Sequence, residues 1–266
     1  MQIGISTASL FGRCYNEDAL PLLDSLDSKV CEIFLESFCE YTKEYGELLK
    51  TKLGGLKVHS IHTLNTHFEP QLFSVNPRAL SDAFKIFEDC LAVGQMLGAS
   101  YYTLHGKARL KKGSTFTNYE ELGLGFKAIC ESAKKYDMQV TLENVEWGCY
   151  GIPGFFSEVR KYAPELKGCL DVKQARVSGF DYKHYIEDMG SNIKTVHLSD
   201  VNEKGGITIP SEKGKFDFGE LFKILAYNGF DGNCLIEIYN ENYKDVSELK
   251  HSLDYLRNIK QKYFKE

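Results

Sequence analysis

The sequence is poor in several features that would assign a protein to a class at once. It has six prolines and one tryptophan, Trp147, and no proline- and serine-rich stretch that would join two domains. No apolar run approaches the ~20 residues that a membrane-spanning helix needs. We therefore expect no membrane partner, and because the first expected strand begins at Ile3 we expect no signal peptide.

Positive charge is not concentrated in any part of the chain. Lysine and arginine together number 32 against 37 aspartates and glutamates, so the net charge is −5, and no basic block is present. Because tight binding of nucleic acid usually needs a basic surface, we do not expect nucleic acid as a partner.

The cysteines show no pairing pattern. All eight are scattered, and no two of them form a CxxC motif. This spacing argues against a zinc ribbon and against a disulfide framework, and it is typical of reduced, buried thiols. We therefore expect a cytoplasmic protein.

What the sequence does contain is a regular series of short apolar runs, with 43% hydrophobic residues overall. Such runs, when helical patterns separate them, are typical of buried parallel strands. Apolar stripes predict helices over residues 78–97, 122–136, 218–227 and 247–263. The eight expected strands are residues 3–6, 30–35, 57–62, 101–105, 139–144, 168–172, 193–198 and 233–238.

Eight strand–helix units in a chain of this length predict an α/β fold of the (β/α)8 TIM barrel type. We expect residues 1–266 to form one such domain. The main alternative is a doubly wound open sheet, but no glycine-rich phosphate-binding fingerprint follows the first strand.

Four side chains that can bind a metal lie near the ends of the last four expected strands. They are Glu143, Asp171, His197 and Glu237. In a barrel these strand ends meet at one rim. Three buried carboxylates would repel one another there, and a divalent cation would remove that conflict. The pattern therefore predicts a metal site in an enzyme.

Five short motifs surround these residues and follow one another in a fixed order. They are Leu142-Glu143-Asn144, Leu170-Asp171-Val172-Lys173-Gln174-Ala175, Val196-His197-Leu198-Ser199-Asp200, Pro210 through Gly214 to Asp217-Phe218, and Ile236-Glu237-Ile238-Tyr239. In their order and spacing they resemble the xylose isomerase-like TIM barrels. That family includes sugar and sugar-phosphate isomerases, ketose 3-epimerases and endonuclease IV, and the resemblance covers nearly the whole chain.

The resemblance implies a metal-dependent isomerase or epimerase that acts on a sugar or sugar phosphate through an enediolate. It implies that Glu143, Asp171, His197 and Glu237 bind one divalent cation. Carboxylate and imidazole ligands suit Mn²⁺ or Mg²⁺, with Zn²⁺ or Co²⁺ as alternatives. In the family's epimerases, the residues that match Glu143 and Glu237 also move protons on opposite faces of the substrate.

Five further residues are candidates for contact with the substrate. His62 and His105 lie at the ends of the third and fourth expected strands, and Trp147 could stack on a sugar ring. Lys173 and Gln174 follow Asp171 directly, and Lys173 could meet a phosphate. Each of them singly also has a plain structural explanation, because strand-end histidines and isolated tryptophans are often packing residues.

Two other functions stay open. One is a phosphoesterase of the endonuclease IV type that acts on abasic DNA, in which residues matching His62 and His105 hold a further zinc. Gln174 replaces a histidine that is frequent in the family, and no Asp-x-His motif lies between Asp200 and Gly214, which argues against a three-zinc site. The other is a barrel that binds a sugar without turnover. The substrate, its phosphorylation and a homo-oligomeric state are also left open.

Overall fold

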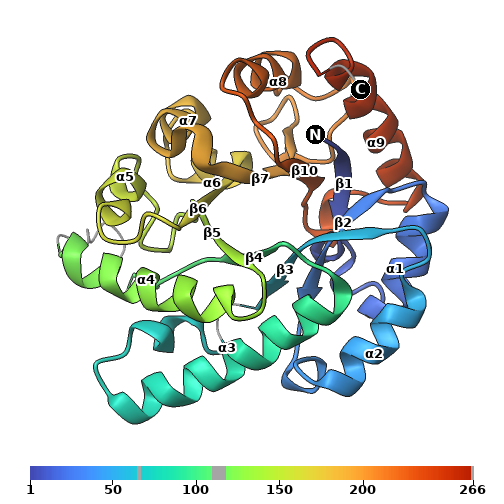
Figure 1. Ribbon diagram of the computed structural model, residues 1–266. Coiled ribbons are helices and arrows are strands. Elements are labelled where there is room, and N and C mark those ends of the chain that lie inside the picture. The colour runs from blue at the N-terminus through green and yellow to red at the C-terminus, as the bar shows by residue number, and fades with distance from the viewer. Residues whose placement is uncertain (65–66, 110–117, 265–266) are drawn as a thin grey trace.

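Eight parallel strands close into a barrel at the centre of the computed structural model, which describes residues 1–64, 67–109 and 118–264. Around the barrel the strand order is β1-β10-β7-β6-β5-β4-β3-β2, and Figure 1 looks along the barrel toward this ring. The (β/α)8 TIM barrel is therefore confirmed. Its strands are β1 (Ile3–Ser6), β2 (Val30–Leu35), β3 (Lys57–Thr63), β4 (Tyr101–Leu104), β5 (Gln139–Glu143), β6 (Lys167–Asp171), β7 (Ile193–Leu198) and β10 (Asn233–Ile236).

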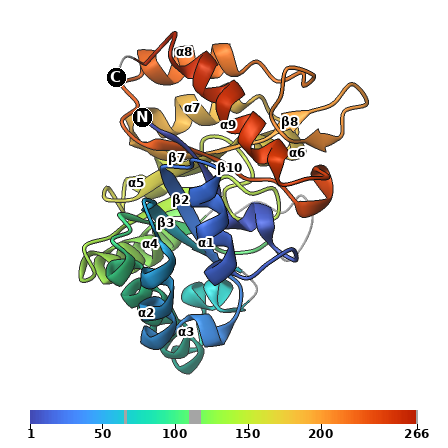
Figure 2. The same ribbon diagram turned by 90° about the vertical axis from the view of Figure 1, so that its right-hand side faces the viewer.

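Helices surround the barrel on its outer side (Figures 1 and 2). The four predicted helices are present within a few residues of their expected ends. The helix predicted over residues 122–136 begins at Tyr119, because the side chain of Asn118 accepts the backbone N–H of Glu121 and caps the first turn. The helices are α1 (Asn16–Ser25), α2 (Lys43–Lys52), α3 (Pro77–Leu97), α4 (Tyr119–Lys134), α5 (Phe155–Arg160), α6 (Val172–Val177), α7 (Tyr182–Met189), α8 (Phe218–Tyr227) and α9 (Ser247–Lys260).

The strands carry different chemistry on their two faces. Residues two apart on a strand point to the same side. Leu142, Leu170 and Val196 point outward and belong to the hydrophobic core between barrel and helices. The alternate residues line the barrel interior, and they are largely polar, namely Thr141 and Glu143 on β5, Cys169 and Asp171 on β6, and Thr195 and His197 on β7.

A short antiparallel hairpin after β7 was not expected from the sequence. It consists of β8 (Asp200–Val201) and β9 (Ile207–Thr208), and Figure 2 shows β8 set off from the barrel strands. The carboxylate of Asp200 accepts the backbone N–H groups of the loop that follows, at Ser211, Lys215 and Phe216. Asp200 therefore shapes this loop.

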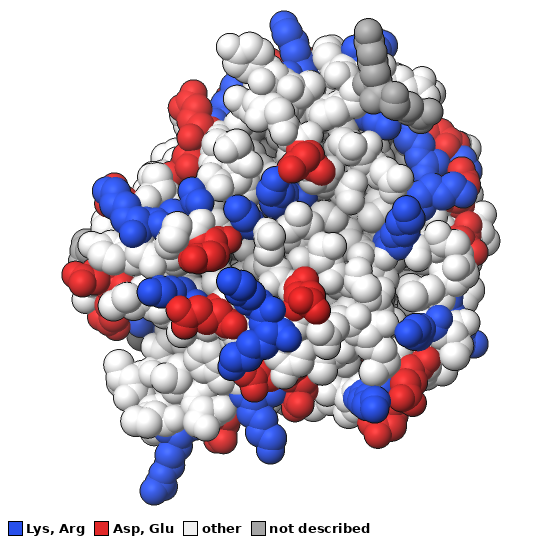
Figure 3. Space-filling view, in the orientation of Figure 1, with Lys and Arg blue, Asp and Glu red and all other residues white. Residues whose placement is uncertain are grey.

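The outer surface is mixed in charge. On the face shown in Figure 3, acidic and basic side chains are interspersed, without a broad area of one sign. Within residues 1–64, 67–109 and 118–264, no helix has the length and apolarity needed to cross a membrane.

Candidate metal centre

The four predicted ligands converge inside one end of the barrel. Glu143 ends β5, Asp171 ends β6, His197 lies in β7, and Glu237 follows the last residue of β10. One ligand atom from each lies within 4.8 Å of those of the other three. All four side chains are buried. Four residues that are far apart in the sequence thus form one compact donor set.

The donor set has the unpaired atoms that a cation site requires. Glu143 Oε2, Asp171 Oδ2 and Glu237 Oε2 are buried and make no hydrogen bond to the described residues. Burial raises the pKa of the Asp171 and Glu237 carboxyls, and the nearby charge of Glu143 raises both further. Unpaired carboxylate oxygens of this kind are costly to bury unless a cation neutralises them. The residues therefore fit a bound divalent metal ion.

The imidazole of His197 is held between two sets of carboxylates. Its Nδ1 lies 3.2 Å from Glu237 Oε2 and 3.5 Å from Glu143 Oε1, and its Nε2 lies 3.0 Å from Glu32 Oε1. Burial lowers the pKa of His197, but the Cys169 thiol and the carboxylates of Glu237 and Glu32 outweigh that effect, so the pKa is raised. Nδ1 is thus the nitrogen that faces the carboxylates of Glu143 and Glu237.

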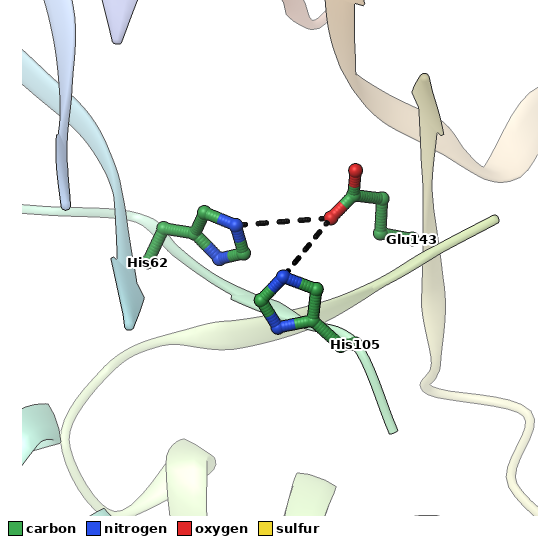
Figure 4. Close-up of side chains that lie close together, drawn as sticks. All are labelled: His62, His105 and Glu143. Atoms are coloured by element: carbon green, nitrogen blue, oxygen red, sulfur yellow. Dashed lines mark ion pairs between the residues drawn. The ribbon is translucent and has the colours of Figure 1, made fainter. Parts of the chain in front are cut away.

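A second group, shown in Figure 4, joins His62 and His105 to the same glutamate. Nε2 of each histidine lies 3.7 Å from Glu143 Oε2. The opposite nitrogen of each ring faces an acceptor, because Nδ1 of His62 lies 2.9 Å from the carbonyl oxygen of Thr103 and Nδ1 of His105 lies 3.0 Å from Glu69 Oε2. Both rings therefore direct Nε2 toward Glu143.

A cavity of about 440 Å³ opens above these residues. The five residues predicted to contact a substrate all line it, together with both candidate catalytic glutamates. The ring of Trp147 lies 5.1 Å from that of His105, and 36% of this residue is exposed, so one side of the indole is available to a ligand. The lining residues are Ala8, Phe11, Phe34, His62, Leu64, His105, Glu143, Trp147, Lys173, Gln174, Glu237, Ile238 and Tyr239.

Two polar residues of the sequence motifs, Asn144 and Gln174, hold Asp171 in place. The side chain of Asn144 accepts the backbone N–H of Asp171 at 2.7 Å and donates to its carbonyl oxygen at 3.0 Å. The backbone N–H of Gln174 donates to Asp171 Oδ1, while Oδ2 makes no hydrogen bond to the described residues. The Gln174 side chain accepts from the backbone N–H of Glu146.

Sequence reasoning missed part of this site. Glu69 lies in a 3-10 turn (Glu69–Phe73) without periodicity, so no local pattern relates it to His105. Glu32 lies within the buried strand β2, and no local pattern relates it to His197, which it meets across the barrel. His59 and His67 do not line the cavity. His59 bonds to Thr195 and Asn233, and His67 bonds to Tyr41.

Comparison with protein families matches residues 12–259 to the xylose isomerase-like TIM barrel family. A comparison with curated proteins found no match. Solved structures similar in fold include D-psicose 3-epimerase from Clostridium cellulolyticum H10 in complex with D-tagatose, with 16% identity over 99% of both chains and a TM-score of 0.77. A D-tagatose 3-epimerase-like protein is 18% identical over 98% of this chain and 99% of its own, with a TM-score of 0.79. The IOLI protein, crystallised with a zinc atom, is 16% identical over the full length of both chains, with a TM-score of 0.75.

Proposed function

Because the chain belongs to the xylose isomerase-like TIM barrel family, we propose that it is a divalent-metal-dependent isomerase or epimerase of a sugar or sugar phosphate. The observation that carries this proposal is the placement of Glu143 and Glu237. They come from β5 and from the end of β10, both line the cavity, and both lie beside Nδ1 of His197. The epimerases of similar fold support the same class of reaction.

The metal ion is proposed to be held by Glu143, Asp171, His197 and Glu237. Three carboxylates and one imidazole favour Mn²⁺ or Mg²⁺, and Zn²⁺ or Co²⁺ are the alternatives. When bound, the ion would supply a Lewis acid that polarises a substrate carbonyl.

The eight cysteines are all unpaired thiols, which fits a reducing compartment, so we infer that the enzyme is cytoplasmic. We also propose that residues 1–266 form one domain.

The chain's own residues would carry the proton transfers. One glutamate removes the proton from the carbon next to the carbonyl, which gives an enediolate, and the other can return a proton to the opposite face. His62, His105 and Gln174 offer nitrogen donors or acceptors to sugar hydroxyls, and Trp147 offers an apolar face to the ring. Lys173 completes the polar lining.

A second candidate function rests on one observation. The group of His62, His105 and Glu143 could hold another cation beside the first, as a dinuclear phosphoesterase would need. Gln174 directs its side chain to a backbone N–H, and no Asp-x-His motif follows β7, so we propose no third ion.

The experiment is a panel of ketoses and ketose phosphates incubated with the Mn²⁺-loaded protein in D₂O, followed by NMR. We expect deuterium to enter one sugar at the carbon next to its carbonyl. If no sugar takes up label and an abasic-site oligonucleotide is cleaved, the phosphoesterase is the correct function. If neither reaction occurs, the proposal of an enzyme fails in favour of a sugar-binding barrel.

A further inference from the structure

Lys173 is a buried cation at the floor of the cavity. It lies in the first turn of α6, two residues after Asp171, and only 5% of it is exposed. Its Nζ lies 3.5 Å from Asp171 Oδ2 and 3.8 Å from Glu237 Oε1. The ring of Tyr239, whose centroid is 4.6 Å away, covers another side of the ammonium. The side chain is therefore fixed with its charge against the proposed metal ligands.

The ammonium group still has donors to offer. An N–H···O hydrogen bond usually spans about 2.7–3.2 Å, so both carboxylate oxygens lie farther from Nζ than in a normal bond. No hydrogen bond of Nζ to the described residues is formed, although a lysine carries three donors. Because Lys173 lines the cavity, an oxygen of a ligand there is the natural acceptor.

The charges around Lys173 determine which kind of ligand oxygen can accept a hydrogen bond from its Nζ. A phosphate dianion at Nζ would also lie against the carboxylates of Asp171 and Glu237, which would repel it. An oxygen that is neutral in the substrate and gains negative charge only during the reaction avoids this penalty. With a divalent cation bound, the three ionised carboxylates would still exceed its charge by one, and Lys173 would supply the positive charge that is lacking.

We propose that Lys173 is a catalytic residue that donates a hydrogen bond to the substrate's carbonyl oxygen and stabilises the negative charge that forms there. This inference rests on the proposed function. In the step, the C–H bond next to the carbonyl breaks and its proton passes to a glutamate. The electron pair of that bond forms the new C=C bond, and the carbonyl π pair moves onto the oxygen. Lys173 keeps its proton throughout.

The test compares Lys173→Met, which keeps the length of the side chain, with Lys173→Arg, which keeps its charge. Lys183→Met is the matched control, because Lys183 is a partly exposed lysine on α7 paired with Glu220. Calorimetry measures the binding of Mn²⁺, and then of two probes at saturating Mn²⁺, namely glycolohydroxamate, a planar anionic mimic of an enediolate, and neutral D-sorbitol. Circular dichroism checks that each variant folds.

For Lys173→Met we expect Mn²⁺ to bind at least as tightly as in the wild type, because a positive charge next to its ligands has been removed. Glycolohydroxamate should lose about 10–100-fold in affinity, as expected for a hydrogen bond to a charged group. The affinity for sorbitol should change little, Lys173→Arg should recover part of the loss, and Lys183→Met should behave as the wild type.

Unchanged glycolohydroxamate affinity in Lys173→Met, or no binding of this probe to the wild type, would overturn the proposal. A collapse of Mn²⁺ binding would also overturn it, since Lys173 would then only hold Asp171 and Glu237 in place. With an active sugar the loss should appear in kcat rather than KM. If the probes behave as expected while no sugar exchanges deuterium, the proposed function fails and the assignment of Lys173 as the donor to an anionic oxygen stands.

Discussion

Nε2 of His197 lies 3.0 Å from Oε1 of Glu32, across the interior of the barrel from β7 to β2. Glu32 is itself fixed, because it accepts hydrogen bonds from the hydroxyls of Ser6, Ser60 and Thr103. A proton on Nε2 that faces this carboxylate leaves the lone pair of Nδ1 for the proposed cation. Carboxylates commonly orient metal-binding histidines in this way.

Glu32→Gln is therefore expected to weaken Mn²⁺ binding by about 10–100-fold while the barrel stays folded. The amide keeps the size of the side chain but removes its charge and adds a donor among groups that already donate. Calorimetric titration with Mn²⁺ measures the effect. Glu158→Gln, which removes an exposed partner of Lys161, is the control. Equal Mn²⁺ affinity in all three proteins would remove Glu32 from the site.

Asp171→Asn tests the donor set directly. The remaining carbonyl oxygen can still accept from the backbone N–H of Gln174, so the start of α6 should survive. The oxygen at the Oδ2 position is replaced by an NH₂ group, and Mn²⁺ affinity should fall by more than the roughly 100-fold upper cost of losing an orienting residue. Asp181→Asn alters the equivalent cap of α7 outside the site. A variant that binds Mn²⁺ normally would show that the four-ligand assignment is wrong.

Glu237→Gln addresses the acid–base role. With whichever sugar exchanges deuterium, kcat should fall by about 10²–10⁴-fold, the usual cost of losing a general base. The rate must be measured at saturating Mn²⁺, with metal content determined on the same sample, because Glu237 is also a proposed ligand. The exposed Glu241 gives the control Glu241→Gln. A fully metallated Glu237→Gln protein with the wild-type rate contradicts the role.

His59 gives the folded protein a predictable dependence on pH. Burial lowers its pKa to about 4, from 6.5. Nδ1 accepts from the side-chain amide of Asn233, while Nε2 faces Thr195 Oγ1, which fits the neutral ring. Between pH 6.5 and about pH 4, His59 is protonated in the unfolded chain but neutral in the folded chain. The stability that the neutral buried ring contributes is therefore lost as the pH falls through that window.

Urea unfolding at pH 7.5 and pH 5.0 measures the loss. Between these values the wild type should lose about 2 kcal/mol more unfolding free energy than His59→Gln, in which residue 59 cannot titrate. Because all other groups are common to both proteins, the difference isolates His59. Parallel pH dependence of the two proteins would mean that the buried ring titrates as it does in the unfolded chain.

The apolar runs predicted the barrel well because burial on the helix-facing side of each strand leaves a local signal. They did not predict the polar interior, since Thr141 or Thr195 inside an apolar run reads as an ordinary strand residue. The four strand-end ligands could be found because their charge contrasts with such a run. Glu69 could not, because its partner His105 is 36 residues away and only the closed barrel joins them.

The hydrogen bonds that Asp200 accepts limit how the loop after β7 can be redesigned. A Cβ on Gly214 would lie 1.7 Å from Asp200 Oδ2, so any other residue at position 214 would collide with the carboxylate that accepts the hydrogen bonds of the loop. The conformation of this loop consequently depends on Asp200 and Gly214 together. A loop transplanted into this position from a homologue therefore has to carry the aspartate and the glycine together.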